Sequence, residues 1–236
     1  MNDTMNDRIV KNLFAIRKNK NDSQEETAAK LGMSRMTYAA IESGKKNITV
    51  DIIEKFSKVY DTPTSRLIFN ICDAEKFKQM LFYILSLFPL GVPKTKLAKL
   101  LYLSDFGFYH DYGSSISGAN YIHRQYGPVA ENFLELIDSF WLSGKISINI
   151  LSEGAFMISS LMFNNKYDLL NEKEKHFIEE VCRAWEQHST VEVVNFTHQQ
   201  KPWASTVDGE FIPYESISQE INYAFPLNYT QHNLKD

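Results

Sequence analysis

Cysteine is scarce in this sequence: only Cys72 and Cys182 occur among its 236 residues. Two cysteines this far apart exclude a disulfide framework and a zinc site built on thiolates, so we expect free thiols in a reducing compartment. The longest apolar run, around residues 80–90, is too short and too interrupted to span a bilayer. The N-terminus is polar and lacks the apolar segment of a signal peptide. These absences predict a cytoplasmic protein with no membrane partner.

What the chain does have is apolar residues and an uneven charge. It is 44% hydrophobic and 13% aromatic, which is enough for one large domain or two small ones with their own cores. Residues 1–70 hold 12 Lys and Arg against 9 Asp and Glu, a net charge of +3, and the remainder holds 13 against 20, a net of −7. A mildly basic N-terminal region followed by an acidic remainder is typical of a small nucleic-acid-binding module joined to a domain that does not bind DNA.

The first seventy residues carry closely spaced helix signals. Ser23 and Glu26 form a capping box, and the helix that follows ends at Gly32. Ser34 caps the next helix, which ends at Gly44. Further helices are expected from Thr49 or Asp51 and, as a short fifth helix, from Pro63. Two short helices joined by a glycine-containing turn are the helix-turn-helix arrangement, in which the second helix enters a DNA major groove.

The segment SQEETAAKLGMSRMTYAAIESGKKNITVDIIEKFSKVYDT resembles the XRE (lambda-Cro-like) repressor family. The resemblance implies binding to operator DNA through the second helix of the motif and the residues around it. The implied DNA-binding residues are Gln24, Ser34, Arg35, Met36, Thr37, Ala40, Lys45, Lys46 and Asn47. Of these, Arg35, Met36 and Ala40 would face base edges, and Arg35 can pair bidentately with guanine. Gln24, Thr37, Lys45, Lys46 and Asn47 would hold phosphates, while Tyr38 and Ile41 should be core.

Two positions depart from that family. Asp22 stands where an apolar residue is usual, and Thr27 stands where leucine is common. We expect both to weaken the packing of the preceding helix, because a buried unpaired polar group costs a few kcal/mol, roughly 2–7. The alternative to operator binding is a helix-turn-helix kept as a dimerisation or packing module.

The second half alternates helix patterns with one strand pattern. We expect helices over about 74–88, from Lys94, from Pro128 to Gly144, from the capping box Asn171–Glu174, and after Ser189. Residues 145–161 alternate apolar and polar side chains about a Glu-Gly turn, which predicts a β-hairpin. The predicted fold is mainly α: a five-helix helix-turn-helix bundle over 1–71, and a mostly helical domain with one small antiparallel hairpin over 72–236.

The second half also resembles the Panacea, or SocA-like, antitoxin domain over roughly residues 77–221. The matching segments are TKLAKLLYLSDF, SISGANYIHRQYGPVAENF and THQQKPWASTVDGEFIPYESI. The resemblance implies an antitoxin that neutralises a toxin encoded by the neighbouring gene. Candidate toxin-binding residues are the surface candidates Tyr121, Arg124 and Tyr126, together with Trp203, which is either a core lid or a partner-binding anchor. A homodimer or a toxin–antitoxin hetero-oligomer is expected, with a role in phage defence.

Nothing in the sequence predicts catalysis. The histidines at 110, 123 and 198, with Asp105 and Asp111, lack metal-ligand spacing, and no serine sits in a nucleophile elbow. We therefore expect no catalytic residue, no metal and no cofactor. Asp105, inside an apolar helix, is expected to accept hydrogen bonds from a loop, with Tyr126 or Arg124 as donors.

Two functions remain open from the sequence. The first is a non-enzymatic type II antitoxin that binds its toxin directly and represses its own operon through the helix-turn-helix. The alternative is a phage-type transcriptional repressor whose C-terminal domain senses a ligand or oligomerises.

Overall fold

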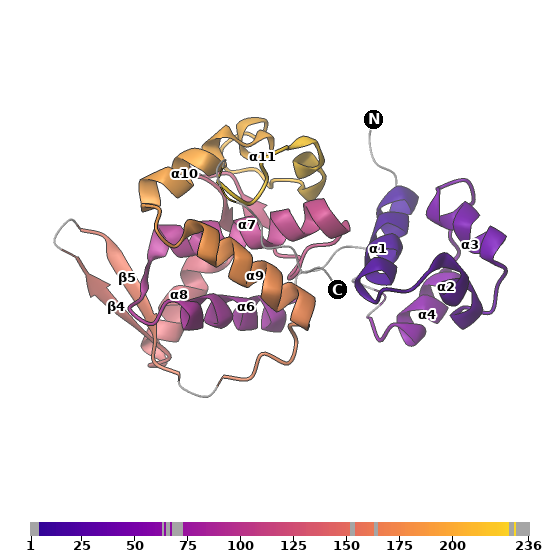
Figure 1. Ribbon diagram of the computed structural model, residues 1–236, viewed down its shortest axis with the longest axis horizontal. Helices are drawn as coiled ribbons and strands as arrows, with labels where there is room; N and C mark the ends of the chain where they lie inside the picture. The colour runs from indigo at the N-terminus through magenta and orange to yellow at the C-terminus, as the bar shows by residue number, and fades with distance from the viewer. Residues whose placement is uncertain are drawn as a thin grey trace. The chain divides into compact units, whose positions relative to one another are not determined.

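The structure is a computed structural model that describes residues 5–62, 64, 67, 73–151, 154–162, 165–226 and 229. The chain forms two compact units, and the second begins at Asp73 (Figure 1). The expected boundary between residues 71 and 72 lies outside the described residues. Each unit has its own hydrophobic core, and each is described separately below.

The first unit is helical and follows the expected order. Its helices are α1 (Met5–Asn19), α2 (Gln24–Lys30), α3 (Arg35–Glu42) and α4 (Val50–Val59). The expected fifth helix falls mostly on residues outside the described ranges. Within that segment the structure describes Thr64 and Leu67, and both are helical. The core joins all four helices through buried apolar side chains, among them Leu13, Ala28, Tyr38, Ile53 and Phe56.

Local capping explains where two of these helices begin. The Ser23 hydroxyl accepts a hydrogen bond from the Glu26 amide at 3.1 Å, and the Glu26 carboxylate accepts one from the Ser23 amide at 2.7 Å. The Ser34 hydroxyl accepts from the amide of Thr37 at 3.1 Å. Both caps satisfy helix amides that would otherwise lack partners, so both predicted helix starts are confirmed.

The two polar departures in this unit both contact the hydroxyl of Tyr60, and the expected weakening is wrong. Thr27 is buried, and its hydroxyl lies 2.7 Å from the hydroxyl of Tyr60. Tyr60 in turn donates to the Asp22 carboxylate at 2.8 Å, and Lys30 donates to the same oxygen at 2.5 Å. Because every polar group in this chain of contacts has a partner, the penalty for an unpaired buried group does not arise.

The second unit is built around one long buried helix. The helices are α6 (Ala74–Leu87), α7 (Lys94–Tyr112), α8 (Phe133–Leu142), α9 (Glu172–Trp185), α10 (Thr190–Gln199) and α11 (Lys201–Ala204), with a 3₁₀ helix, η1, over Tyr214–Gln219. Residues 96–109 of α7 are all buried, and α7 lies among the other helices of the unit (Figure 1). Such an all-round covered helix explains the continuous apolar pattern in its sequence.

Two small antiparallel sheets complete the unit. The expected hairpin is present as β4 (Ile146–Ile150) and β5 (Phe156–Ser160), and the short strand β1 (Val92–Pro93) pairs with β5. A second sheet pairs β2 (Tyr121–Ile122) with β3 (Val129–Ala130). The mainly α fold is confirmed, with these extra two-residue strands added.

The helix expected from Pro128 begins later than predicted, and this prediction is wrong. Val129 and Ala130 pair with β2, and the amide of Glu131 donates to the carbonyl of Asn120 at 2.8 Å. Those backbone groups are therefore used in a sheet, and α8 starts only at Phe133.

Candidate functional site

The predicted base-reading end of α3 is exposed. Met36 is 85% exposed, and the side chain of Arg35 is exposed. Tyr38 and Ile41 lie on the other face and are buried, as expected. Ala40 is half-buried and offers only a methyl group. Arg35 is thus the side chain on this helix that is best placed to reach a base edge.

The predicted phosphate-binding residues cluster at the two ends of α3. Lys45, Lys46 and Asn47 are exposed in the loop that follows it, and the Lys46 amide donates to the carbonyl of Ala40 at 3.0 Å. At the other end the Thr37 hydroxyl lies 2.9 Å from that of the capping residue Ser34. These positions stay predictions, but their exposure and their backbone anchoring suit contacts to a sugar–phosphate backbone.

Gln24 is held by a buried ion pair rather than projecting freely. Its amide nitrogen donates to Glu42 at 2.5 Å, and Glu42 also accepts two hydrogen bonds from Arg17 at 2.6 and 3.0 Å. The Arg17–Glu42 pair ties α1 to the end of α3. It therefore fixes α3 against the rest of the unit and orients Gln24 beside it.

In the second unit, Tyr121 is not a surface residue, and its prediction as a toxin contact is wrong. Its side chain is only 1% exposed and its hydroxyl donates to Asp105 at 2.9 Å. Its ring packs edge-on against Tyr102 and Phe106 of α7. The position is a core residue because β2 turns its side chain towards α7.

Asp105 holds the following loop as expected, but through other donors than Tyr126 or Arg124. Besides Tyr121, it accepts from the amide of Ser117 at 2.8 Å and from the Ser117 hydroxyl at 2.5 Å. Complete burial raises the pKa of Asp105, and these hydrogen bonds oppose that rise. The carboxyl group therefore fixes the loop geometry.

The motif Tyr126-Gly127-Pro128 crosses directly over Lys99 of α7. Tyr126 is 67% exposed, and Gly127 has φ +86°. A Cβ atom at Gly127 would lie 2.9 Å from both Lys99 Cε and Thr197 Oγ1, so only glycine fits this approach. Lys99 donates to the carbonyl of Pro128 at 2.7 Å. The close crossing fixes the loop that presents Arg124 and Tyr126 at the surface.

Trp203 holds the same loop in place. Its indole is half-buried and stacks between the rings of His123 and His198, at centroid distances of 4.2 and 4.0 Å. Its Nε1 donates to the backbone carbonyl of Arg124 at 3.1 Å. This geometry favours the core-lid interpretation of Trp203 over the partner-binding anchor. The ring is only partly exposed, and it lies beside the exposed Arg124.

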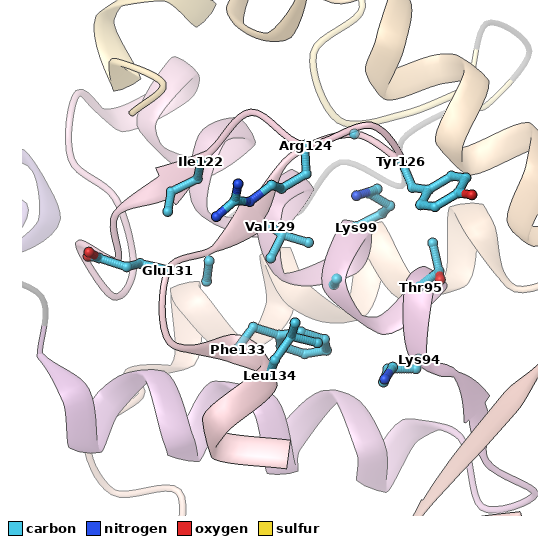
Figure 2. A pocket seen from close by; sticks show the side chains of 13 residues that line it. Lys94, Thr95, Lys99, Ile122, Arg124, Tyr126, Val129, Glu131, Phe133 and Leu134 are labelled. Atoms are coloured by element: carbon cyan, nitrogen blue, oxygen red, sulfur yellow. The ribbon is translucent and has the colours of Figure 1, made fainter. Parts of the chain in front are cut away.

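A cavity of about 300 Å³ opens beneath the loop. Arg124, Tyr126 and Lys99 lie on one side of it, with Lys99 next to Tyr126, and Phe133 and Leu134 lie on the other (Figure 2). Its lining comes from α7, from the β2–β3 loop and from the start of α8: Lys94, Thr95, Ala98, Lys99, Ile122, Arg124, Tyr126, Gly127, Val129, Ala130, Glu131, Phe133 and Leu134.

The sequence reasoning missed the cavity and its lysine. Lys99 is fully buried, whereas a lysine in a helical sequence is ordinarily assigned to the solvent side. The available signal was its position: α7 has apolar residues on all sides, so a lysine in its middle has little chance of reaching solvent.

Among the described residues no group of three or more His, Cys, Asp and Glu is arranged to hold a metal ion. Cys182 is a free, buried thiol whose pKa is raised by burial, and Cys72 lies outside the described residues. Within the described ranges, no helix combines the length and hydrophobicity needed to cross a bilayer.

Comparison with known families identifies both units. Residues 13–67 match the family model "Helix-turn-helix", and residues 97–204 match the model "Antitoxin SocA-like, Panacea domain". Both resemblances seen in the sequence are thereby confirmed. No curated protein and no solved structure matches the chain significantly. The two matches together support a DNA-binding regulator of the antitoxin type.

Proposed function

We propose that this chain, which joins a helix-turn-helix domain to an antitoxin SocA-like, Panacea domain, is the antitoxin of a type II toxin–antitoxin system. It binds the toxin encoded by the neighbouring gene directly and blocks it, in the cytoplasm and in the context of phage defence. It acts by binding and not by catalysis. The observation that carries the proposal is the match of residues 97–204 to the antitoxin domain.

The helix-turn-helix unit represses the antitoxin's own operon in this proposal. Support comes from the exposed Arg35 at the start of α3 and from the exposed Lys45 and Lys46 after it. One side chain for base readout and two cations for phosphates are a small set for one copy of the unit. A homodimer on a pseudo-palindromic operator doubles that set and is therefore the proposed DNA-bound form.

The toxin is proposed to dock on the loop that carries Arg124 and Tyr126. Both side chains are exposed, while three contacts fix their backbone. These are the close approach of Gly127 to Lys99, the hydrogen bond from Lys99 to the Pro128 carbonyl, and the hydrogen bond from Trp203 to the Arg124 carbonyl. Exposed arginine and tyrosine side chains on a rigid backbone are typical of interface hot spots, because little conformational entropy is lost when the partner binds. Trp203 contributes chiefly by positioning them.

Co-expression tests the proposal. The neighbouring gene is placed under an inducible promoter, and growth is measured with and without the full-length chain. We expect growth arrest by the neighbouring product alone and rescue by the chain. Co-purification of the two proteins then distinguishes direct binding from repression, since binding survives when the neighbouring gene is transcribed from a foreign promoter.

The cavity beneath the loop favours one alternative, a phage-type repressor whose second domain senses a ligand. In that case the neighbouring product is harmless, and operator binding changes when a ligand is added. A gel shift of the upstream region, with and without candidate ligands, separates the two functions.

A further inference from the structure

We propose that the cavity bounded by α7, the β2–β3 loop and α8 binds a carboxylate carried on an apolar body, with the Lys99 ammonium as its counter-ion. This site goes beyond the proposed function, because it exists whether or not the chain neutralises a toxin. The carboxylate can belong to a free small acid or to the C-terminus of a peptide, and the experiment below distinguishes the two.

The charge on Lys99 is the first support. Lys99 is 0% exposed, and among the described residues its only hydrogen-bond acceptor is the Pro128 carbonyl at 2.7 Å. No described carboxylate lies within ion-pair distance of it. An ammonium group has three donors and a full charge, so two donors and the charge are left uncompensated.

Each of the other two buried lysines of the unit has a compensating group, a carboxylate or the end of a helix. Lys76 forms an ion pair with Glu174 at 2.6 Å. Lys96 donates to the backbone carbonyls of Glu186 and His188 at 3.1 and 2.6 Å, where α9 ends. Acceptors at a helix C-terminus favour a cation. Lys99 therefore differs from Lys76 and Lys96 in lacking a compensating group, and the cavity is the open space next to it.

The charges around Lys99 favour an incoming anion. Lys94 and Arg124 line the same cavity, and Glu131 is the one carboxylate in its lining. On the α10 side, His198 has its pKa lowered by burial and by the charges of Lys99 and His123. Tyr126 adds a neutral hydroxyl at the rim. A single carboxylate thus enters a site with more positive than negative groups, whereas a multiply charged anion would also be repelled by Glu131.

Two buried ring nitrogens beside this region also lack hydrogen bonds. They are Nε2 of His198 and Nδ1 of His123, and the latter lies 3.5 Å from the exposed Asp208 carboxylate. The pKa of Lys99 is lowered to about 7, and the pKa of His198 is lowered as well. Both side chains therefore carry less positive charge at neutral pH than an exposed lysine and an exposed histidine would. A bound carboxylate would restore that charge.

The rest of the lining selects an apolar body. Ala98, Ile122, Val129, Phe133 and Leu134 present hydrocarbon to the cavity. A volume of about 300 Å³ lies at the small end of ligand sites and suits a ligand of modest size. Apolar walls beside the Lys99 ammonium, whose direction is fixed by its hydrogen bond to Pro128, therefore favour a monocarboxylate with a hydrophobic body.

Calorimetric titration of the full-length chain tests this assignment with 4-phenylbutyrate and its uncharged amide. We expect the acid to bind at least about tenfold more tightly than the amide, the factor for one charge-assisted hydrogen bond. Affinity for the acid should fall as the pH rises from 6.5 to 8.5, because Lys99 must be protonated to pair with it. Equal affinities, or no acid binding at millimolar concentration, would overturn the proposal.

A second pair of probes identifies the source of the carboxylate. Acetyl-Ala-Ala-Phe is compared with the same peptide amidated at its C-terminus. Preference for the free peptide over 4-phenylbutyrate assigns the site to a protein C-terminus, and the reverse order assigns it to a free acid. Either order supports a carboxylate site, and binding of both amides as tightly as the acids contradicts it.

Two variants place the binding in the cavity. Lys99→Met should weaken the acid at least about tenfold and leave the amide unchanged. Because Lys99 is buried, Leu134→Trp provides a test that does not alter the core: Leu134 is 54% exposed and lines the cavity. Leu142→Trp, on the same helix at 80% exposure and outside the cavity, is its matched control. Wild-type acid binding by Leu134→Trp would place the ligand elsewhere and refute the site.

Discussion

Replacing Lys99 by methionine is expected to change how the stability of the second unit depends on pH. Burial lowers the pKa of the Lys99 amine from its ordinary value of 10.5 to about 7. Between these values the unfolded chain holds a proton at this amine that the native state has lost, so the free energy of unfolding rises with pH. From pH 7 to 8.5 this one group contributes about 1.5–2 kcal/mol, which methionine removes.

The assay is urea unfolding followed by tryptophan fluorescence at pH 7.0 and 8.5. All tryptophans, at positions 141, 185 and 203, belong to the second unit, so the signal is free of the first unit. Burial raises the pKa of Cys182, which adds a pH dependence of its own, but it does so equally in wild type and variant. Lys145→Met, at an exposed lysine, is the control and should behave as wild type. The same pH dependence in wild type and Lys99→Met would refute the reasoning.

Three further predictions concern the DNA-binding helix and the loop. Arg35→Ala should weaken operator binding by about 1–3 kcal/mol in a gel shift at fixed salt, because a bidentate base contact is lost. Tyr126→Ala should abolish rescue from the toxin while leaving the urea midpoint unchanged, because its exposed ring contributes about 2 kcal/mol or more to binding as a hot spot. Gly127→Ala should lower the free energy of unfolding by about 1–3 kcal/mol for its positive φ, and by more for its overlap with Lys99 and Thr197.

Each of these variants has a matched control in the chain. Lys58→Ala removes an exposed cation of α4 outside the assigned DNA surface, and equal weakening by it and by Arg35→Ala would contradict the docking. Leu90→Ala, at 93% exposure, should still rescue, and loss of rescue in both would argue against Tyr126 as a contact. Gly209 has the same φ of +86° with open space around it. Equal destabilisation by Gly127→Ala and Gly209→Ala would show that the crossing over Lys99 is not tight.

Helix starts could be predicted from the sequence because their causes are local. The capping box of Asn171 and Glu174 opens α9, and Ser189 opens α10 with Glu192 as its partner. The hairpin β4–β5 was predicted for a similar reason, since an alternating pattern about a turn is visible within some fifteen residues. The exposed face of α3 followed from the spacing of its motif.

The second sheet could not be predicted, because its strands are two residues long and depend on partners across a loop. Tyr121 pairs with Ala130 and Ile122 with Val129. Nothing within either segment distinguishes such a strand from a loop, so the sequence predicts a helix start at Pro128 and a surface position for Tyr121. The pairing decides both outcomes: it uses the backbone groups of Val129 and Ala130 and turns Tyr121 into the core.

The polar contacts show the same division between local and tertiary causes. That Asp105 must have partners followed from a carboxylate in an apolar helix, but which donors reach it depends on the path of the loop, which brings Ser117 and Tyr121. Asp22 and Thr27 were expected to be costly, since their partner Tyr60 lies more than thirty residues away. The candidate site beside Lys99 was missed for the same reason, because burial of a lysine is a result of tertiary packing.

Growth rescue tests the central claim most directly. Cells that express the neighbouring gene's product from a foreign promoter are compared with and without the full-length chain, with colony counts as the readout. The antitoxin account predicts that the product alone stops growth, that the chain restores it, and that the two proteins co-purify. A toxic product that the chain fails to neutralise, or a neighbouring product with no toxicity, would contradict the account.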